Sequence, residues 1–561
     1  MVERRRYGRC GGATVGRKYE RGVAKTRGPR VDGSLFSGVD MAARNGTVRA
    51  DAHNGEANAR QRTGQGTRAG GQRSWRRFSV QRQPEALPCS PRTTQVCLRF
   101  GISPRPEPFW IVRDLDLPAE GGKIVLLLGP SGSGKTAVLQ ELNRLGGAGR
   151  GPNRRSSVRL GSSAGRCITG TTRVADVGRT RMPAGRAIVD LVAREAGLGR
   201  SLAILTTCGI GEPRLWIRPY AELSEGEQFR ARLARALSQA ERASQAEANA
   251  NHPGPAVLLC DEFCAVLHRR AAKAIAYNLR KLVGRSEPAG NSRGLMLVTA
   301  CTHEDIVADL QPDVTVRLQG GGRYVVAQST PRQRPISFFR RLRIERGTKA
   351  DYQTFGAMHY RCTAELGFVD KVFTLRDGVG GEALGVVVYA HGPMELSLRN
   401  KATNGQFVRN PGRLNREVRI LRRLVIHPDV RGCGLGHWLV RETLGMVGVP
   451  YVECLANMGT VNPVFERAGM ERIGECPLPA GRQKMWEQLA RLKVDPLVED
   501  FAEQVKRRPA VRRLVRQVAF DWLRATTGGG EKRVLRWGPE ALAMTFRQLV
   551  GSRPVYYLWH R

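Results

Sequence analysis

Two glycine-rich segments, each placed between an apolar run and a helical pattern, limit what this chain of 561 residues can fold into. The first follows the apolar run Ile124–Leu128 and reads Gly-Pro-Ser-Gly-Ser-Gly-Lys-Thr over 129–136. The second follows Val418–His427 and reads Arg-Gly-Cys-Gly-Leu-Gly over 431–436. Glycines let backbone N–H groups close around an anion at the start of a helix, so each segment predicts a phosphate-binding turn. Two turns of different design predict two sites on separate domains.

The composition divides the chain into five segments. An Arg- and Gly-rich stretch without periodic apolar residues comes first and predicts a disordered tail. Two segments with apolar strand patterns carry the glycine-rich turns, a Pro-rich linker separates them, and basic helices with apolar residues at spacings of three and four follow. The expected boundaries are 1–95 for the tail, 96–330 for the first domain, 331–345 for the linker, 346–480 for the second domain and 481–561 for the helices.

The charge balance is strongly basic. Lys and Arg number 91 against 50 Asp and Glu, which gives a net charge of +41 and an isoelectric point near 11.0. A surplus of this size favours polyanions through counterion release, so RNA or DNA is the first partner to expect and an anionic membrane surface the second. A solvated tail that contacts no partner explains the tail's share of the positive charge equally well.

The chain lacks the signals of a membrane or secreted protein. No apolar stretch approaches the ~20 residues that span a bilayer, and no signal-peptide core follows the first arginines. Its twelve cysteines have no paired metal spacing, as in reduced cytosolic chains. We therefore expect a cytoplasmic protein without membrane insertion.

Three further segments accompany the first turn. Residues 223–230 read Leu-Ser-Glu-Gly-Glu-Gln-Phe-Arg, the apolar run Ala256–Cys260 ends before two acids, and Leu295–Ala300 leads to a histidine. In this order and spacing, the four segments resemble the nucleotide-binding domain of the ABC ATPase superfamily over residues 96–330. The resemblance implies ATP and Mg²⁺ as cofactors, with Thr136 and Asp261 as metal ligands.

The resemblance also implies roles for the other residues. Glu262 would orient the attacking water, and His303 would lie near the γ-phosphate. An aromatic that stacks on adenine is expected at Phe100, with Trp110 as the competing candidate. The implied ATP-binding residues are Phe100, Gly129, Pro130, Ser131, Gly132, Ser133, Gly134, Lys135, Thr136, Ser224, Gly226 and Glu227.

The turn at 223–227 implies a dimer. In the family, Ser224 and Gly226 would contact a nucleotide bound to another subunit, and one turn per chain then requires an ATP-dependent homodimer. The pattern also departs from transporters: Glu227 is closer to soluble DNA-repair members, and no glutamine lies between Gln140 and Gln228. His268 stands where an aspartate is expected.

The second turn has its own resemblance. The Arg-x-x-Gly-x-Gly form, the preceding His-Pro and the following helical pattern resemble the GNAT N-acetyltransferase superfamily, whose loop holds the pyrophosphate of acetyl-CoA. A dinucleotide-binding fold is the alternative, but it requires an acid about twenty residues on, where Glu453 lies inside a strand pattern. The implied acetyl-CoA-binding residues are Leu424, Val425, Ile426, Arg431, Gly432, Cys433, Gly434, Leu435, Gly436 and Asn462.

The residue that would protonate the leaving thiolate in the second domain is not evident from the sequence. Many GNAT members carry a tyrosine where this chain has Phe465, which cannot donate a proton. Glu417, Glu453, Cys454 and the cluster 359–361 are candidates, and each is more often structural in such a position.

The expected fold class is α/β multidomain, with an ABC-type P-loop NTPase domain, a GNAT α+β domain, a disordered basic N-terminal tail and a helical C-terminal extension. The leading hypothesis is an ABC ATPase fused to an N-acetyltransferase that acts on nucleic acid or another macromolecule. The alternatives are an ATPase that remodels DNA or RNA with a non-catalytic GNAT-like sensor, and the ATP-binding subunit of a transporter.

Overall fold

The structure is a computed structural model, and its described residues lie within one compact unit, 59–561. The ranges that it describes are 74–82, 89–103, 107–146, 173–247, 255–285, 294–332, 334–359, 366–477, 480–498, 500–527, 534–551 and 553–561. Among these residues, no helix is long and apolar enough to cross a bilayer.

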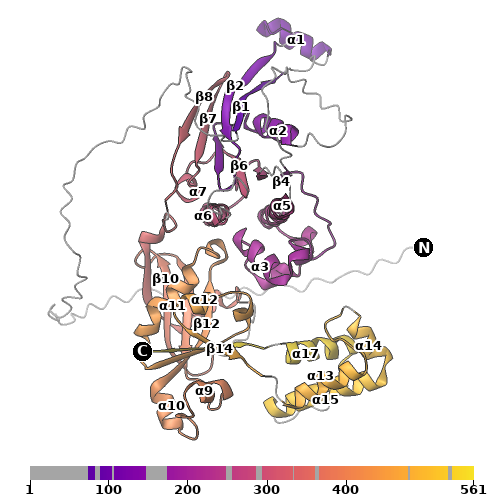
Figure 1. Ribbon diagram of the computed structural model, residues 1–561, viewed down its shortest axis with the longest axis vertical. Helices are drawn as coiled ribbons and strands as arrows, with labels where there is room; N and C mark the ends of the chain where they lie inside the picture. The colour runs from indigo at the N-terminus through magenta and orange to yellow at the C-terminus, as the bar shows by residue number, and fades with distance from the viewer. Residues whose placement is uncertain are drawn as a thin grey trace, which may run out of the picture. The chain divides into compact units, whose positions relative to one another are not determined.

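The first sheet has six strands in the order β4-β5-β6-β3-β7-β8. Figure 1 labels β4, β6, β7 and β8 of this sheet. Every residue of β3, β5 and β6 is buried, as expected for parallel strands covered on both faces. Only β8 is antiparallel to its neighbour. The strands are β3 (Ile124–Leu128), β4 (Val174–Asp176), β5 (Ala256–Cys260), β6 (Leu295–Cys301), β7 (Val314–Gly320) and β8 (Arg323–Gln328).

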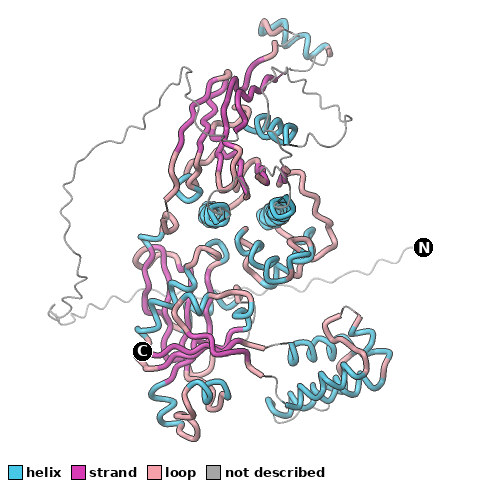
Figure 2. The backbone as a smooth tube through the Cα atoms, in the orientation of Figure 1, coloured by secondary structure: helices cyan, strands magenta, loops and turns pink. Residues whose placement is uncertain are grey.

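Helices cover this sheet and carry its loops. In Figure 2 they are the cyan coils beside the magenta strands of the first sheet. Both glycine-bearing turns of this domain open directly into a helix, the first into α2 and the one at 224–227 into α5. The helices are α2 (Lys135–Gly146), α3 (Leu198–Thr207), α4 (Pro213–Trp216), α5 (Glu225–Glu247), α6 (Arg269–Arg285) and α7 (Val307–Leu310).

Part of the segment predicted as a disordered tail is folded. Strand β1 (Ser74–Arg82) pairs antiparallel with β2 (Phe109–Pro118), and α1 (Pro91–Phe100) lies between them in the chain. Phe78 and Val80 are buried against the first sheet's core. The tail boundary at residue 95 is therefore too late, because these two apolar residues suffice for a strand edge among arginines and glutamines. Residues 1–73 lie outside the described part.

The second sheet has seven strands in the order β14-β15-β13-β12-β11-β10-β9. The apolar run predicted at 418–427 corresponds to β12 within one residue. Only the β12 and β13 pair is parallel. The strands are β9 (Leu342–Gly347), β10 (Val369–Asp377), β11 (Ala383–Ala390), β12 (Val418–Ile426), β13 (Tyr451–Ala456), β14 (Glu471–Glu475) and β15 (Val555–His560).

Two strands of this sheet lie in segments that the sequence predicted to be a linker or helices. Strand β9 begins inside the expected linker, where Ile336 and Phe338 already pack into the core. Strand β15 ends the segment expected to be helices and inserts between β13 and β14. The helical region between β14 and β15 has its own apolar core. Its helices are α13 (Ala480–Arg491), α14 (Phe501–Arg507), α15 (Pro509–Thr527) and α17 (Pro539–Gly551).

Short helices complete the second domain. Helix α11 begins inside the second glycine-rich turn and packs on the sheet through buried Leu439 and Val440. The helices of this domain are α8 (Lys349–Gly356), α9 (Ser397–Ala402), α10 (Pro411–Glu417), α11 (Leu435–Met446), η6 (Asn457–Thr460) and α12 (Val464–Arg467).

Candidate functional site

The first glycine turn leaves β3 and returns into α2 within a few residues. Gly129, Gly132 and Gly134 have φ values of +151°, +78° and +97°. A Cβ on Gly129 would lie 2.4 Å from the carbonyl oxygen of Leu318, and one on Gly134 would lie 2.3 Å from Cγ2 of Ile111. Side chains at these two positions would force the turn open, so the tight cradle depends on glycine.

Lys135 spans this cradle. Its Nζ donates hydrogen bonds to the carbonyl oxygens of Gly129 at 2.8 Å and Pro130 at 2.7 Å. Within the described residues, the turn's backbone N–H groups donate to no protein acceptor except from Ser133, and the buried Ser133 hydroxyl has no partner. Unpaired donors at a helix N-terminus fit the phosphates of ATP.

Two acids follow β5 close to this lysine. Burial lowers the pKa of Lys135, while the carboxylates of Asp261 and Glu262 act in the opposite direction. The Oδ1 atom of Asp261 accepts a hydrogen bond from the Glu262 N–H at 3.0 Å, and Glu262 holds a left-handed φ of +48°. The turn thus brings Lys135, Asp261 and Glu262 into one electrostatic environment. The oxygens of Asp261 and of exposed Thr136 are of the type that Mg²⁺ prefers.

The remaining residues predicted for ATP have different degrees of support from the structure. His303 is exposed just beyond β6, the neighbour of β5, and its N–H donates to the Cys301 sulfur at 3.3 Å. Phe100 is the last residue of α1 and is 73% exposed. Trp110 lies in β2 with the Arg113 guanidinium 4.6 Å from its ring centre. The adenine-stacking role of either aromatic stays a prediction.

The turn before α5 is closed by its own glutamate. The Oε2 atom of Glu227 accepts hydrogen bonds from the N–H and the hydroxyl of Ser224, both at 2.9 Å. Both hydrogen bonds run from Ser224 to the Glu227 side chain, which caps the start of α5, and the carboxylate is favoured at the positive end of the helix. Gly226 lies against Leu267, since a Cβ there would be 3.1 Å from its Cδ2.

The Glu227 carboxylate predicts weaker ATP-dependent dimerisation than an uncharged residue would give. If this turn meets the γ-phosphate of another subunit, the Glu227→Gln variant removes a repulsion of about 1 kcal/mol, or about fivefold in affinity. Glutamine preserves the cap. Sedimentation at increasing ATP concentration, in the Glu262→Gln background, measures the change. Glu222→Gln on the preceding turn is the control, and an equal shift in both variants would contradict the contact.

The second glycine turn lies where the sheet divides. Strands β12 and β13 pair only over Val418–Leu421 and Tyr451–Cys454, although β12 continues to Ile426. Among the described residues, Leu424, Val425 and Ile426 therefore have no ladder partner on the β13 side. Gly432 and Gly434 have φ values of +85° and +88°. In the described part of the chain, the N–H groups of residues 432–436 donate to no protein acceptor.

The first half of this turn contacts the first domain. The Arg431 guanidinium lies 3.3 Å from the Gly211 carbonyl and 3.3 Å from the Glu212 carboxylate, and it also bonds the carbonyls of Ile426 and Met358. A Cβ on Gly432 would lie 2.6 Å from Nδ2 of Asn278 on α6. The Arg431 side chain is thus used in protein contacts, and its place among the acetyl-CoA-binding residues stays a prediction.

The same region contains a second link to the first domain. His268, which stands where the ABC family has an aspartate, has Nδ1 3.2 Å from Oδ2 of Asp429. Ala274 and Tyr277 of α6 belong to the same apolar cluster as Val430 and Cys433. Burial raises the pKa of the Cys433 thiol to about 12. Cys433 is therefore a packing residue rather than a thiolate.

The acid candidates of the second domain are engaged in structural contacts. Glu453 is fully buried and accepts from Arg399 at 2.5 and 2.8 Å and from the Tyr556 hydroxyl at 2.9 Å. Glu417 pairs with Arg413, and burial raises the pKa of Cys454. His359 is half-buried, while Tyr360 and Arg361 lie outside the described residues.

A hydroxyl that the sequence did not point to lies beside Phe465. The Tyr557 ring on β15 is 5.2 Å from the buried Phe465 ring, and its hydroxyl donates to Glu466 at 2.9 Å. Asn462 is exposed before α12, and its N–H donates to the Met458 carbonyl. Because Tyr557 and Phe465 are far apart in the chain, no local pattern indicates their contact.

Comparison with known proteins gives one informative relative. The aliphatic sulfonates import ATP-binding protein SsuB 2 of Nocardia farcinica (strain IFM 10152) is 31% identical over 218 residues, which cover 38% of this chain and 75% of the relative. No family model matches the chain.

Two solved structures are weakly similar. The dimeric ATP-binding cassette MJ0796, in a post-hydrolysis state bound to ADP and Pi, is 16% identical over 44% of this chain and 97% of its own, with a TM-score of 0.29. A bacterial Atm1-family ABC exporter with ATP bound is 19% identical over 38% of this chain and 35% of its own, with a TM-score of 0.27. Scores this low carry no weight for the fold. On the identity and coverage of the curated relative, together with the geometry of the first turn, the chain belongs to the ABC ATPase family.

Proposed function

We propose that this protein is a homodimeric ABC ATPase whose second domain transfers an acetyl group from acetyl-CoA to an amine on a nucleic acid or another macromolecule. The ATPase part rests on the cradle at 129–136, in which Lys135 shares its surroundings with Asp261 and Glu262. The transferase part rests on the division of the sheet between β12 and β13, directly beside the second turn.

In the ATPase, each residue has a separate task. The free N–H groups of the cradle and the Lys135 ammonium would bind the phosphates, and Thr136 and Asp261 would hold Mg²⁺, which neutralises developing charge when bound. Glu262, exposed at the strand end, would orient the attacking water and take its proton. His303 at the end of the adjacent strand would contact the γ-phosphate.

The exposed position of Ser224 supports the dimer. Its turn lies at the start of α5, and Ser224 would complete the site of a second subunit. Two chains arranged head to tail would then share two ATP sites, and dimerisation would depend on ATP.

In the transferase, the unpaired edge of β12 and the free N–H groups of 432–436 are the supporting features. A pyrophosphate would accept from these N–H groups at the start of α11, and the backbone of Leu424, Val425 and Ile426 would pair with the arm of the cofactor. The buried Glu453 is not available as a base because Arg399 and Tyr556 occupy its oxygens.

Release of free coenzyme A from acetyl-CoA, with and without ATP and total RNA, tests the transferase. We expect the Gly434→Glu variant to lose the release by about tenfold or more, because Gly434 has φ +88° and the added carboxylate faces a pyrophosphate. Gly445→Glu is the control on the same helix, where a Cβ would meet nothing within 4 Å. Wild-type protein that releases no coenzyme A under any condition would refute the transferase.

Two other functions have a specific observation in their favour. The SsuB 2 relative is named as an import ATP-binding protein, which favours the energising subunit of a transporter. Phe465 in place of a tyrosine favours a remodelling ATPase with a non-catalytic GNAT-like domain. Copurification with a membrane permease would support the first, and RNA-stimulated ATP hydrolysis without coenzyme A release would support the second.

A further inference from the structure

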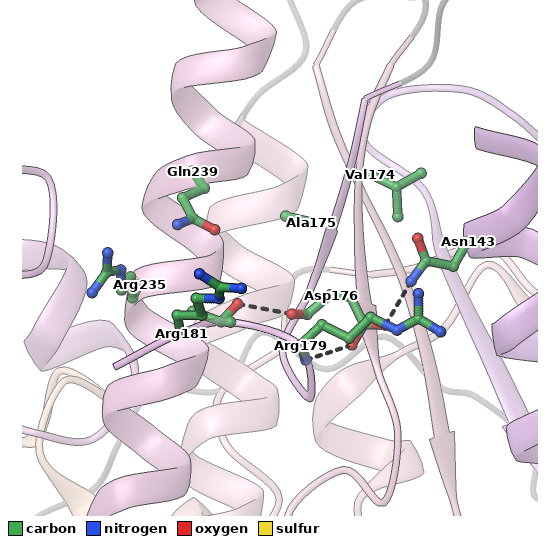
Figure 3. Close-up of a pocket in the computed structure, with 9 residues that line it drawn as sticks. Asn143, Val174, Ala175, Asp176, Arg179, Arg181, Arg235 and Gln239 are labelled. Atoms are coloured by element: carbon green, nitrogen blue, oxygen red, sulfur yellow. Dashed lines mark hydrogen bonds and ion pairs between the residues drawn. The ribbon is translucent and has the colours of Figure 1, made fainter. Parts of the chain in front are cut away.

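A pocket of about 450 Å³ lies in the first domain at the edge of the sheet. Figure 3 shows its side chains, with Asn143 on α2, Arg235 and Gln239 on α5, and the others on β4 and the segment that follows it. The residues that line it are Asn143, Val174, Ala175, Asp176, Arg179, Thr180, Arg181, Arg235 and Gln239.

The pocket carries an excess of positive charge. Three arginines line it, against Asp176 as the one carboxylate among the lining residues. Both oxygens of Asp176 are in use: Oδ2 accepts from Asn143 at 2.7 Å and lies 3.5 Å from Nε of Arg179, and Oδ1 accepts from the Gly178 N–H at 2.9 Å. Arg181 and Arg235 have no ion pair within the described residues.

Arg235 is the clearest sign of a missing partner. Its Nη1 atom is buried without a hydrogen bond in the described structure, as is Nε of Arg232 one turn earlier on α5. Burial lowers the pKa of Arg235, and the charge of Arg186 adds to the effect. An arginine stays protonated in proteins, and a desolvated charge is costly unless an anion compensates it. Arg235 thus carries a partly buried positive charge that no carboxylate neutralises in the described structure.

The pocket shares no lining residue with the proposed ATP site. None of its lining residues belongs to the cradle at 129–136, to the turn at 224–227 or to the Asp261–Glu262 pair. Strand β4 is at the edge of the sheet, and β5 and β6 lie between it and β3, the strand that leads into the cradle.

We infer that this pocket binds a phosphate group between Arg181 and Arg235, as a ligand additional to ATP. Guanidinium groups match the oxygens of a phosphate in charge and geometry. A volume near 450 Å³ exceeds what a single phosphate fills and is in the range of pockets that hold small organic ligands. The amides of Asn143 and Gln239 offer a donor and an acceptor for such an organic part. The inference is independent of acetyl transfer.

Isothermal titration of the full chain with inorganic phosphate and with AMP tests the inference. Lys135→Ala is the background, since it weakens phosphate binding at the cradle. In this background we expect saturable binding of a phosphate probe, and about tenfold weaker binding once Arg181→Gln is added. Tighter binding of AMP would assign an organic phosphate, and equal affinity of the two probes would assign free phosphate.

The controls distinguish phosphate binding at this pocket from a general attraction of phosphate to a basic protein. Arg242→Gln removes the same charge from an exposed position on α5, where Arg242 pairs with Glu195. The affinity of this variant for phosphate should equal that of the Lys135→Ala protein. Arg235→Gln should weaken binding as Arg181→Gln does; exposed Arg181 is the variant least able to disturb folding. Absence of saturable binding in the Lys135→Ala protein, or equal weakening by Arg242→Gln, would overturn the inference.

Discussion

The Glu262→Gln variant is expected to hydrolyse ATP about 100-fold more slowly than the wild-type protein, while it still binds ATP. Glu262 is exposed directly after the buried strand β5, and its charge acts on Lys135 of the cradle. Glutamine fills the same space but cannot take a proton from water. Since hydrolysis would normally end the ATP-bound state, the variant should accumulate as an ATP-bound homodimer.

Steady-state phosphate release and sedimentation velocity with ATP measure the two effects. Glu107→Gln, an exposed acid in the same domain, is the matched control and should retain activity and the wild-type association state. A Glu262→Gln protein that stays monomeric at saturating ATP would contradict the composite site with Ser224. Unchanged hydrolysis would remove Glu262 from the mechanism and leave the cradle as a binding site only.

Replacing Arg399 with Met should lower the free energy of unfolding of the second domain by about 3 to 5 kcal/mol. Arg399 and Glu453 are fully buried, and their charge-assisted hydrogen bonds measure 2.5 and 2.8 Å. Methionine has a comparable length but leaves the Glu453 carboxylate with the Tyr556 hydroxyl as its remaining hydrogen-bond partner among the described residues. A buried carboxylate without its cation is the source of the loss.

Urea unfolding followed by tryptophan fluorescence measures this loss, since Trp438 and Trp559 pack against the core of the second sheet. The double variant Arg399→Met/Glu453→Leu should lose less than Arg399→Met alone, because both charges leave the core together. The half-exposed pair Arg413–Glu417 supplies the matched control, and Arg413→Met should cost no more than about 1 kcal/mol. Equal losses from Arg399→Met and Arg413→Met would show that the buried pair is not specially stabilising.

The sequence was sufficient where the signal was local. The apolar runs of β3, β5 and β6 are continuous because both faces of a parallel strand are covered, and the first glycine turn follows β3 directly in the chain. The sequence was insufficient where long-range pairing decides. Strand β1 has its apolar residues among arginines, and β15 follows basic helices, so both become strands only through partners distant in sequence.

The same limit applies to the site. Lys135, Asp261 and Glu262 were predicted together because a known order of motifs relates them, and the structure brings them together. The contact of Arg431 with Glu212 and the pairing of Glu453 with Arg399 join segments whose sequences carry no sign of one another. The arginine pocket beside β4 was missed for the same reason, since its side chains come from three separate elements.

Strand β15 also constrains how the protein is made. Its position between β13 and β14 means that β14, synthesised long before, has no hydrogen-bonding neighbour in the sheet until β15 has left the ribosome. Until then the edge of β13 that later pairs with β15 stays exposed, and an exposed strand edge favours misassembly during translation. The helices from α13 to α17 are fixed at both ends by this sheet, so a protease cut among them should leave two fragments that stay associated.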